Sequence, residues 1–358
     1  MRQSRWQLFK RKLFEVPFFM KLFHWEFWPF NVVYFPVFVY YAFLAVRARS
    51  IFFFSAANPT IEFGGMLGES KGDIFNLIPE KYIPTTKCFP PSSSATNITT
   101  WMEATGLTYP ILLKPDIGER GWMVKKIDSL ADIERYLRSV KVDFLAQAYV
   151  PYRIELGLFY YRFPGAKKGR ISSITRKGLM AVTGDGKTTV RNLLKSNLRA
   201  RLYIRDFEEK YPEKMDMVPG KGEPIEVEPI GNHCRGTTFL DDTEKVTEAL
   251  EATFDQIAVS IPGFHFGRFD LRCKSYDELE KGINFKILEL NGAGAEPGHV
   301  YQPGRSIWKG YRDILHHLNV LCNIAIQNHR LGVPYTPFKE GLRFIKKVKA
   351  YNRLKESE

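Results

Sequence analysis

Cysteine is scarce in this chain of 358 residues, which has only four, Cys88, Cys234, Cys273 and Cys322. None of them forms a CxxC pair, and the histidines do not cluster at the spacing of metal ligands. The sequence therefore gives no sign of a disulfide framework or a zinc site. A reducing, cytosolic compartment is the simplest expectation, with the cysteines as packing residues.

Acidic residues are outnumbered, since 39 Asp and Glu face 52 Lys and Arg, for a net charge of +13. The excess lies at the two ends of the chain. Residues 1–50 carry eight basic residues against two acidic ones, interleaved with many aromatic rings, and a second basic stretch covers 339–355. This pairing suits a bilayer interface better than a nucleic acid, so we predict membrane lipids as partners and no nucleic-acid partner.

Residues 27–46 carry no formal charge and are about long enough to cross a hydrocarbon core of ~30 Å as a helix. Pro29 and Pro36 interrupt this run, and basic residues flank it on both sides. Because such flanks tend to stay in the cytoplasm, we predict a monotopic segment, re-entrant or in-plane and bent near Pro36. A spanning helix and a buried core helix are the alternatives. For residues 339–355, an amphipathic helix on lipid and a solvated terminal helix are both open.

The rest of the chain alternates strand-like and helix-like patterns, which predicts an α+β fold. Hydrophobic residues make up 44% of the sequence, enough for a sizeable core. Residues 50–57 predict a buried strand, residues 170–184 a hairpin, and residues 188–202 a single helix. No internal repeat is visible.

Residues 111–124, ILLKPDIGERGWMV, predict a strand that delivers Lys114, then a turn from Gly118 to Gly121, then a second strand. A lysine beside such a turn can hold phosphate oxygens while backbone N–H groups approach them closely. The segment is not a P-loop, because GxxxxGK[ST] is absent. The alternative is an ordinary surface hairpin.

A second motif lies on two predicted strands, GRFDLR and FKILELNG. Asp270, Glu289 and Asn291 can point to one face of paired strands, and Arg268 reaches the same face. Three hard oxygen ligands suit Mg²⁺. A solvated strand face is the alternative, but the neighbouring positions are hydrophobic.

A third motif, AQAYVPYRIE, combines an extended stretch with a carboxylate. Its residues Gln147, Ala148, Tyr149 and Val150 suit the edge of an adenine, and Glu155 can accept hydrogen bonds from ribose hydroxyls.

In this order the motifs resemble the ATP-grasp superfamily over about residues 64–325. The closest branch contains D-alanine–D-alanine ligase, glutathione synthetase and cyanophycin synthetase. The resemblance implies two α+β lobes that grip ATP, here with a reduced pre-ATP-grasp domain and an N-terminal membrane-associated helical segment. The implied divisions are a membrane segment (1–50), a reduced N-terminal lobe and linker (51–105), a lid (106–165), a catalytic lobe (166–330) and a basic tail (331–358).

The resemblance also assigns roles. It implies ATP and Mg²⁺ as cofactors, with two metal ions and Mn²⁺ as an alternative. The metal ligands would be Asp270, Glu289 and Asn291, and the catalytic cations Arg268 and Lys114. The nucleotide-binding residues would be Lys71, Lys114, Gly118, Arg120, Gly121, Gln147, Ala148, Tyr149, Val150 and Glu155. Near the same site, we predict that His233 and Arg235, with Glu296, His299 and Arg305, recognise a substrate, and that His233 or His299 is a candidate base. For each histidine, an ordinary hydrogen-bonded structural role is the alternative.

The predicted activity is an ADP-forming ligation, in which a carboxylate is activated as an acyl phosphate and coupled to an amine. The enzyme would be membrane-associated with its catalytic domain facing the cytoplasm, and one substrate would be membrane-associated or lipid-linked. The ending LELNGAGAEP departs from the D-alanine ligases and argues against a D-alanyl dipeptide product. The alternatives are an ATP-grasp phosphotransferase and a non-catalytic nucleotide-sensing scaffold. The sequence carries no signal for an oligomeric state.

Overall fold

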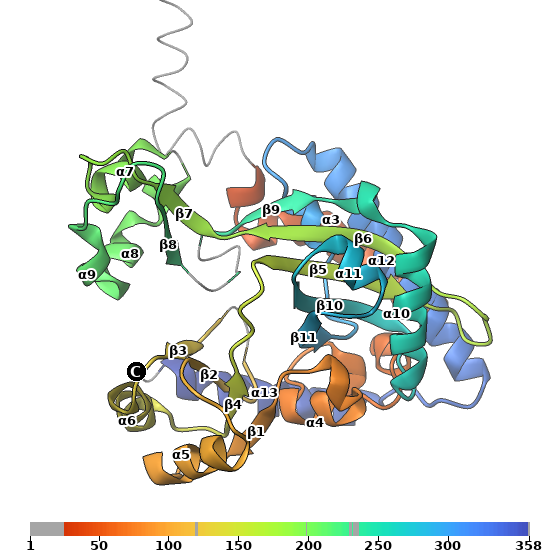
Figure 1. Ribbon diagram of the computed structural model, residues 1–358. Coiled ribbons are helices and arrows are strands. Elements are labelled where there is room, and N and C mark those ends of the chain that lie inside the picture. Colours follow the sequence, from red (N-terminus) through yellow and green to blue (C-terminus); the bar gives the residue numbers. More distant parts are fainter. Residues whose placement is uncertain (1–24, 119–120, 198, 229–230, 232–235, 357–358) are drawn as a thin grey trace, which may run out of the picture. The chain divides into compact units, whose positions relative to one another are not determined.

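The computed structural model of the chain describes residues 25–118, 121–197, 199–228, 231 and 236–356 (Figure 1). The chain divides into two compact units. Unit 1 comprises Met1–Phe38, Lys177–Leu240 and Gly298–Arg312, and unit 2 comprises Val39–Arg176, Asp241–Pro297 and Asp313–Glu358. Helices and antiparallel strands are mixed along the chain, so the predicted α+β class is confirmed.

A small antiparallel sheet in unit 2 has the strand order β1-β4-β2-β3. Its elements are β1 (Thr86–Phe89), α5 (Ala95–Ala104), β2 (Ile111–Pro115), β3 (Lys125–Ile127), α6 (Leu130–Ser139) and β4 (Phe144–Ala148). Each helix begins after a serine, Ser94 or Ser129, whose side chain accepts a backbone N–H of the first turn. Apolar residues of both helices pack on one face of the sheet and form its core.

The larger sheet has the strand order β11 (Phe285–Asn291), β10 (Phe266–Cys273), β5 (Ile154–Tyr161), β6 (Arg170–Gly178) and β9 (Thr238–Asp241), and the pairs from β11 to β6 are antiparallel. Side chains alternate between its two faces. On one face, Leu158 and Phe269 pack with Phe254 of helix α10 (Glu248–Ser260). On the other face, Phe159 contacts His317 of helix α12 (Ile307–Arg330), with ring centroids 4.6 Å apart. The rest of this second face carries the polar residues of the candidate site.

The remaining elements of unit 2 include helix α13 (Phe338–Glu356), which is not a solvated terminal helix. Its inner face is apolar and packs on the protein, with the ring of Phe344 4.7 Å from that of Phe63. Burial of this face explains why the helix docks, while Lys339, Lys346, Lys347 and Lys349 remain exposed. Shorter elements are η2 (Phe53–Ala56), η3 (Glu62–Gly65), α4 (Lys71–Leu77), η4 (Glu80–Tyr82), η7 (Thr243–Lys245) and α11 (Tyr276–Glu280).

The apolar N-terminal run forms one helix, α3 (Phe30–Ala48), which passes through Pro36 without a break. A re-entrant turn within these residues is therefore not what the structure has, because a proline removes only a single backbone hydrogen bond and the helix continues past it. Among the described residues, α3 is long and apolar enough to cross a membrane by length and composition. One face is buried through Val33, Val37 and Leu44, while the opposite face is apolar and exposed.

Unit 1 has a two-stranded sheet of β7 (Met180–Thr183) and β8 (Pro224–Glu228), packed against short helices. The predicted hairpin at 170–184 is wrong, because β6 pairs with β5 and β7 pairs with β8. A single residue separates β6 from β7, too little for a chain reversal. The other elements in and beside this unit are η1 (Trp25–Phe27), α7 (Val190–Ser196), η5 (Ala200–Leu202), α8 (Ile204–Lys210), α9 (Pro212–Met215), β9 (Thr238–Asp241) and η8 (Gly298–Tyr301).

Two further predictions of secondary structure are corrected. The helix predicted over 188–202 ends at Ser196, where Asn197 adopts an extended conformation and its side chain caps the N–H of Ala200. The run 50–57 is buried as expected but forms the short helix η2 instead of a strand. Here Ser55 donates to the carbonyl of Phe52, a local bond that favours the turn.

Candidate active site

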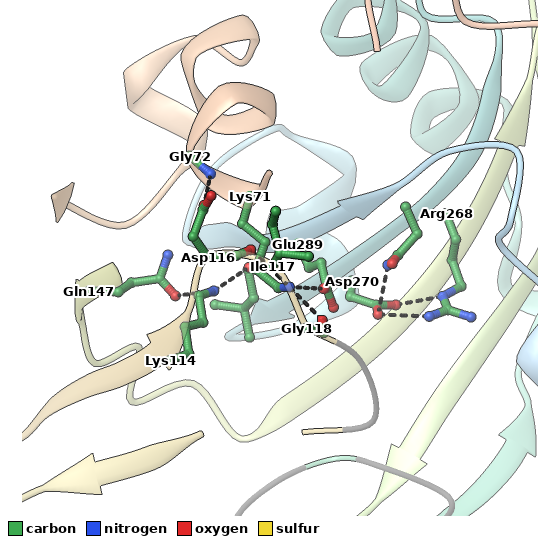
Figure 2. Close-up of polar contacts among 12 residues, drawn as sticks. Lys71, Gly72, Lys114, Asp116, Ile117, Gly118, Gln147, Arg268, Asp270 and Glu289 are labelled. Carbon is green, nitrogen blue, oxygen red and sulfur yellow. Dashed lines mark hydrogen bonds and ion pairs between the residues drawn. The ribbon is translucent and has the colours of Figure 1, made fainter. Parts of the chain in front are cut away.

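Strands β10 and β11 bring the three predicted metal ligands together. In the register of this pair, Asp270 lies opposite Glu289 and Arg268 lies opposite Asn291. Directly opposed residues share a face of the sheet, so the four side chains form one polar cluster. The alternation expected from the sequence is therefore what the structure shows, and Figure 2 shows Asp270, Glu289 and Arg268 in this arrangement.

Asp270 is held by a forked contact with Arg268. The Nε and Nη2 atoms of Arg268 donate to the two carboxylate oxygens at 2.8 and 3.0 Å, and Nη1 donates to the carbonyl of Glu296 at 2.9 Å. Burial acts to lower the pKa of Arg268, but Asp270, together with Glu289 and Glu296, outweighs it, so the pKa is raised. Asn291 also donates to Asp270, at 3.3 Å. The guanidinium is thus charged and fixed on the face of the metal ligands.

Gly157 of β5 makes room for this cluster, a feature that the sequence motifs did not identify. It lies opposite Asp270, and a Cβ at this position would be 3.1 Å from Asp270 Oδ1 and 3.2 Å from Arg268 Cδ. A larger residue would therefore press on the ion pair. A glycine in the middle of an otherwise apolar, aromatic strand was the signal available in the sequence.

Lys71, at the first turn of α4, joins the glycine segment to the metal face. Its Nζ donates to the carbonyl of Gly118 at 2.6 Å and to that of Asp116 at 3.3 Å, and lies 3.6 Å from Glu289 Oε1. Asp116, which the sequence reasoning missed, accepts the N–H of Gly72 at 2.8 Å and so links the two segments again (Figure 2). The only signal for Asp116 in the sequence was its position two residues before Gly118, the first glycine of the predicted phosphate-binding turn.

Lys114 of β2 connects the two sheets. Its Nζ donates at 3.0 Å to Gln147 Oε1 in the small sheet and at 3.0 Å to the carbonyl of Leu288 in the larger sheet. Burial lowers the pKa of Lys114 to about 8, with Glu289 acting in the opposite direction and Lys71 adding to the lowering. A buried cation whose bonds are to neutral groups is suited to receive an anion.

The predicted adenine stretch is only partly free of the sheet. Gln147 and Ala148 belong to the central strand β4, and the Ala148 N–H donates to Thr85. The side chain of Gln147 is occupied by Lys114 and by Thr86. The chain leaves the sheet after Ala148, so Tyr149 and Val150 are the members of this set with backbone outside a strand.

Glu155, predicted to bind ribose, is paired in the structure with Arg272. The Arg272 Nε donates to Glu155 Oε2 at 2.9 Å, and Nη1 donates to the carbonyl of Val150 at 3.2 Å. Both side chains are at least nine-tenths buried, and although burial opposes it, Glu155 raises the pKa of Arg272. Arg272 was missed, although it continues the alternation of Arg268 and Asp270 along β10. By bonding to the carbonyl of Val150, Arg272 connects the segment between β4 and β5 to the larger sheet.

Several predicted residues lie elsewhere. Arg120, His233 and Arg235 fall outside the described residues, whereas Gly121 is described and adopts a positive φ of 71°. His299 and Arg305 belong to unit 1, so their predicted role beside this site stays a prediction.

The donor set fits a hard divalent cation. Among residues 25–118, 121–197, 199–228, 231 and 236–356, no three His, Cys, Asp or Glu side chains form a metal-binding group. The site instead combines two carboxylates, Asp270 and Glu289, with the amide of Asn291. Oxygen donors that leave positions for water and phosphate suit Mg²⁺ and disfavour zinc.

No protein-family model matches the chain, and no curated protein matches it. Solved structures do show similarity. One is a bifunctional glutathione synthetase from Pasteurella multocida, at 13% identity and a TM-score of 0.36 over 69% of this chain and 36% of that one. A second is the VanG D-Ala:D-Ser ligase from Enterococcus faecalis, at 12% identity and a TM-score of 0.40 over 71% of this chain and 61% of that one.

A third is a D-alanine–D-alanine ligase from Bacillus anthracis, at 10% identity and a TM-score of 0.41 over 74% of this chain and 69% of that one. The chain spans about a third of the glutathione synthetase and less than two thirds of the D-Ala:D-Ser ligase.

Proposed function

We propose that this chain is an ATP-grasp carbon–nitrogen ligase that forms ADP, activating a carboxylate as an acyl phosphate and coupling it to an amine. The observation that carries the proposal is the position of Lys114, which bonds to both sheets of unit 2. Next to it, Lys71 lies within 3.6 Å of Glu289, a predicted metal ligand. Cations that can take phosphate oxygens and oxygen ligands that can take Mg²⁺ thus meet in one place.

The chemistry follows from charge. Lys71 and Lys114 would neutralise phosphate oxygens as the carboxylate attacks the terminal phosphorus of ATP. When bound by Asp270, Glu289 and Asn291, Mg²⁺ (two ions in this proposal, with Mn²⁺ as an alternative) supplies further neutralisation of phosphate charge. Because such a reaction needs positioning and electrostatics but no nucleophile from the protein, the site requires no activated serine or cysteine.

Arg268 is proposed to stabilise the oxyanion that forms when the amine attacks the acyl phosphate. It is already charged, partly buried and aimed along the metal face by Asp270 and the carbonyl of Glu296. A donor that is fixed in advance needs no reorganisation during the reaction. His233 and Arg235 are proposed to recognise a substrate, as the sequence motif suggests.

The nucleotide is proposed to lie between the two sheets of unit 2, with the adenine edge at Tyr149 and Val150. This fits a division in which strands β2, β3 and β4 of the small sheet belong to the lid (106–165) and β10 and β11 belong to the catalytic lobe (166–330), while β1 lies in the preceding segment (51–105). Strand β5 (Ile154–Tyr161) lies in the larger sheet although it falls within the lid range, and on this ground we propose that the hinge lies before Ile154.

The experiment is to incubate the full-length protein with ATP, Mg²⁺ and pools of carboxylates, with hydroxylamine as a general amine. We expect ADP release that depends on one pool, together with a hydroxamate of that carboxylate, and loss of both in Lys114→Met. A stable phosphorylated product without hydroxamate would instead identify a phosphotransferase. A protein that binds MgATP but never turns it over would support the scaffold alternative.

We also propose that the enzyme works at a membrane with its catalytic domain facing the cytoplasm, on a lipid-linked or membrane-borne substrate. The support is the outer face of α3, which is apolar and uncharged and 56–77% exposed at Val32, Phe35, Val39, Phe43 and Val46. Because the opposite face of α3 is buried in the protein, the geometry favours a helix lying in the plane of the interface over one surrounded by lipid. Basic residues in 1–50 and 339–355 would add attraction to anionic lipid.

A further inference from the structure

We propose that the C-terminal helix α13 positions the phosphate-binding segment 116–118, and that Tyr351 is the positioning residue. The Tyr351 hydroxyl donates to the carbonyl of Ile117 at 2.9 Å, across 234 positions of sequence. The next carbonyl, that of Gly118, accepts from Lys71 Nζ at 2.6 Å (Figure 2). The inference rests on the proposed function, since it gives this segment the nucleotide phosphates as its ligand.

The orientation of one peptide group explains how this bond can matter. In a trans peptide the C=O and the following N–H point in opposite directions. Holding the Ile117 carbonyl toward α13 therefore directs the N–H of Gly118 away from α13. Backbone N–H groups of such a turn are the groups that bind phosphate oxygens. Tyr351 thus fixes the direction of a donor that it does not touch.

The helix that carries Tyr351 is itself firmly placed. Val348, one turn earlier, packs so closely on Gly68 that a Cβ there would lie 2.4 Å from Val348 Cγ2. Gly68 has a positive φ of 72° and lies three residues before Lys71. The start of α13 is held by Phe338, whose ring stacks on Phe52 with centroids 6.0 Å apart. One helix therefore contacts both the segment of Lys71 and the segment of Gly118.

Tyr351 is suited to a constant role as donor. Its ring packs against the core of the small sheet, so the hydroxyl is held in place. Burial raises the pKa of Tyr351 to about 12, and the carboxylates of Asp116 and Asp143 contribute in the same direction. The hydroxyl consequently keeps its proton at any pH used for assay.

The test compares Tyr351→Phe with a matched control, Tyr41→Phe. Both variants remove a tyrosine hydroxyl that donates to a backbone carbonyl, and Tyr41 donates to Ile51. The probe is Mg²⁺ with a non-hydrolysable ATP analogue, measured by titration calorimetry on the full-length protein. We expect the Kd to rise about 2- to 10-fold in Tyr351→Phe, the usual size of one lost hydrogen bond, and to stay unchanged in Tyr41→Phe. An unchanged Kd in Tyr351→Phe, or equal increases in both variants, overturns the proposal.

A second measurement separates this inference from the proposed function. Hydrogen–deuterium exchange is followed in peptides that contain residues 116–118, without nucleotide. We expect faster exchange there in Tyr351→Phe and wild-type exchange in Tyr41→Phe. If the wild-type protein does not bind the analogue, the proposed function fails. Exchange that is also unaltered in Tyr351→Phe then overturns the positioning role as well.

Discussion

Arg268 holds Asp270 through two parallel hydrogen bonds, Nε to Oδ1 at 2.8 Å and Nη2 to Oδ2 at 3.0 Å, although the two residues are only two positions apart on β10. Neighbours of this spacing lie on the same face of a strand, which lets the guanidinium turn back onto the carboxylate. The same carboxylate is a proposed metal ligand. Removing Arg268 leaves the buried charge of Asp270 and removing Asp270 leaves the partly buried charge of Arg268, so activity and stability have to be measured together.

For Asp270→Asn we expect Mg²⁺-dependent ATP turnover to fall at least about 10- to 100-fold, because a charged oxygen ligand is lost from the site. The matched control is Asp255→Asn, since Asp255 also accepts hydrogen bonds, from Tyr160 and the N–H of Gly169, on helix α10. The measurement is the Mg²⁺ dependence of turnover alongside thermal unfolding. Equal Mg²⁺ dependence in the two variants would argue against the metal site.

The pH dependence of stability should report the burial of Lys114. Its pKa falls from 10.5 to about 8 in the folded protein, so between these values the unfolded chain binds more protons. The contribution of Lys114 to the free energy of unfolding is therefore complete above pH 10.5 and is lost as the pH falls through about 8. Urea unfolding from pH 7 to 10 should show this rise in wild type and a flatter curve in Lys114→Met.

The same titration predicts weaker nucleotide binding above about pH 8, because Lys114 loses its charge there. In Lys114→Met the Kd for MgATP should be about 10- to 100-fold higher at pH 7, the usual effect of losing a hydrogen bond to a charged group. The ratio of the Kd of Lys114→Met to that of wild type should fall as the pH rises above about 8, because wild-type Lys114 then loses its charge as well. A constant ratio of the two Kd values from pH 7 to 10 would contradict the assignment.

Breaking the pair of Glu155 and Arg272 should destabilise the protein strongly. Arg272→Met leaves Glu155 buried without its cation, which typically costs about 3–5 kcal/mol. The double variant Glu155→Gln with Arg272→Met should recover part of this loss, since no charge is then stranded. Urea unfolding measures both. A single variant that unfolds like wild type would show that the pair contributes little to the free energy of unfolding.

A charge on the outer face of α3 should weaken membrane binding. Val39→Glu places a carboxylate on this face, and Val259→Glu on α10 is its matched control, because the two valines are 58% and 57% exposed. Flotation with vesicles of phosphatidylcholine and phosphatidylglycerol should show a several-fold loss of bound protein for Val39→Glu only. Equal binding by both variants would remove α3 from the lipid contact.

The sequence by itself determined the pieces of the candidate site. The alternation of Arg268, Asp270, Glu289 and Asn291 predicted a shared face, because side chains alternate on any strand whatever it pairs with. The spacing of apolar residues likewise predicted the α+β class and a helix at each end of the chain. These features depend on local backbone geometry, which a sequence pattern records directly.

Only the tertiary structure decided which segments meet. Lys114 bonds to Leu288, Glu155 to Arg272 and Tyr351 to Ile117, and each of these pairs is more than a hundred positions apart in the chain. The wrong prediction of a hairpin at 170–184 has the same origin. Strand β7 pairs with β8, which comes much later in the chain, and not with its neighbour β6. Contacts of this kind depend on how buried faces pack together, and a local pattern of residues carries no information on that.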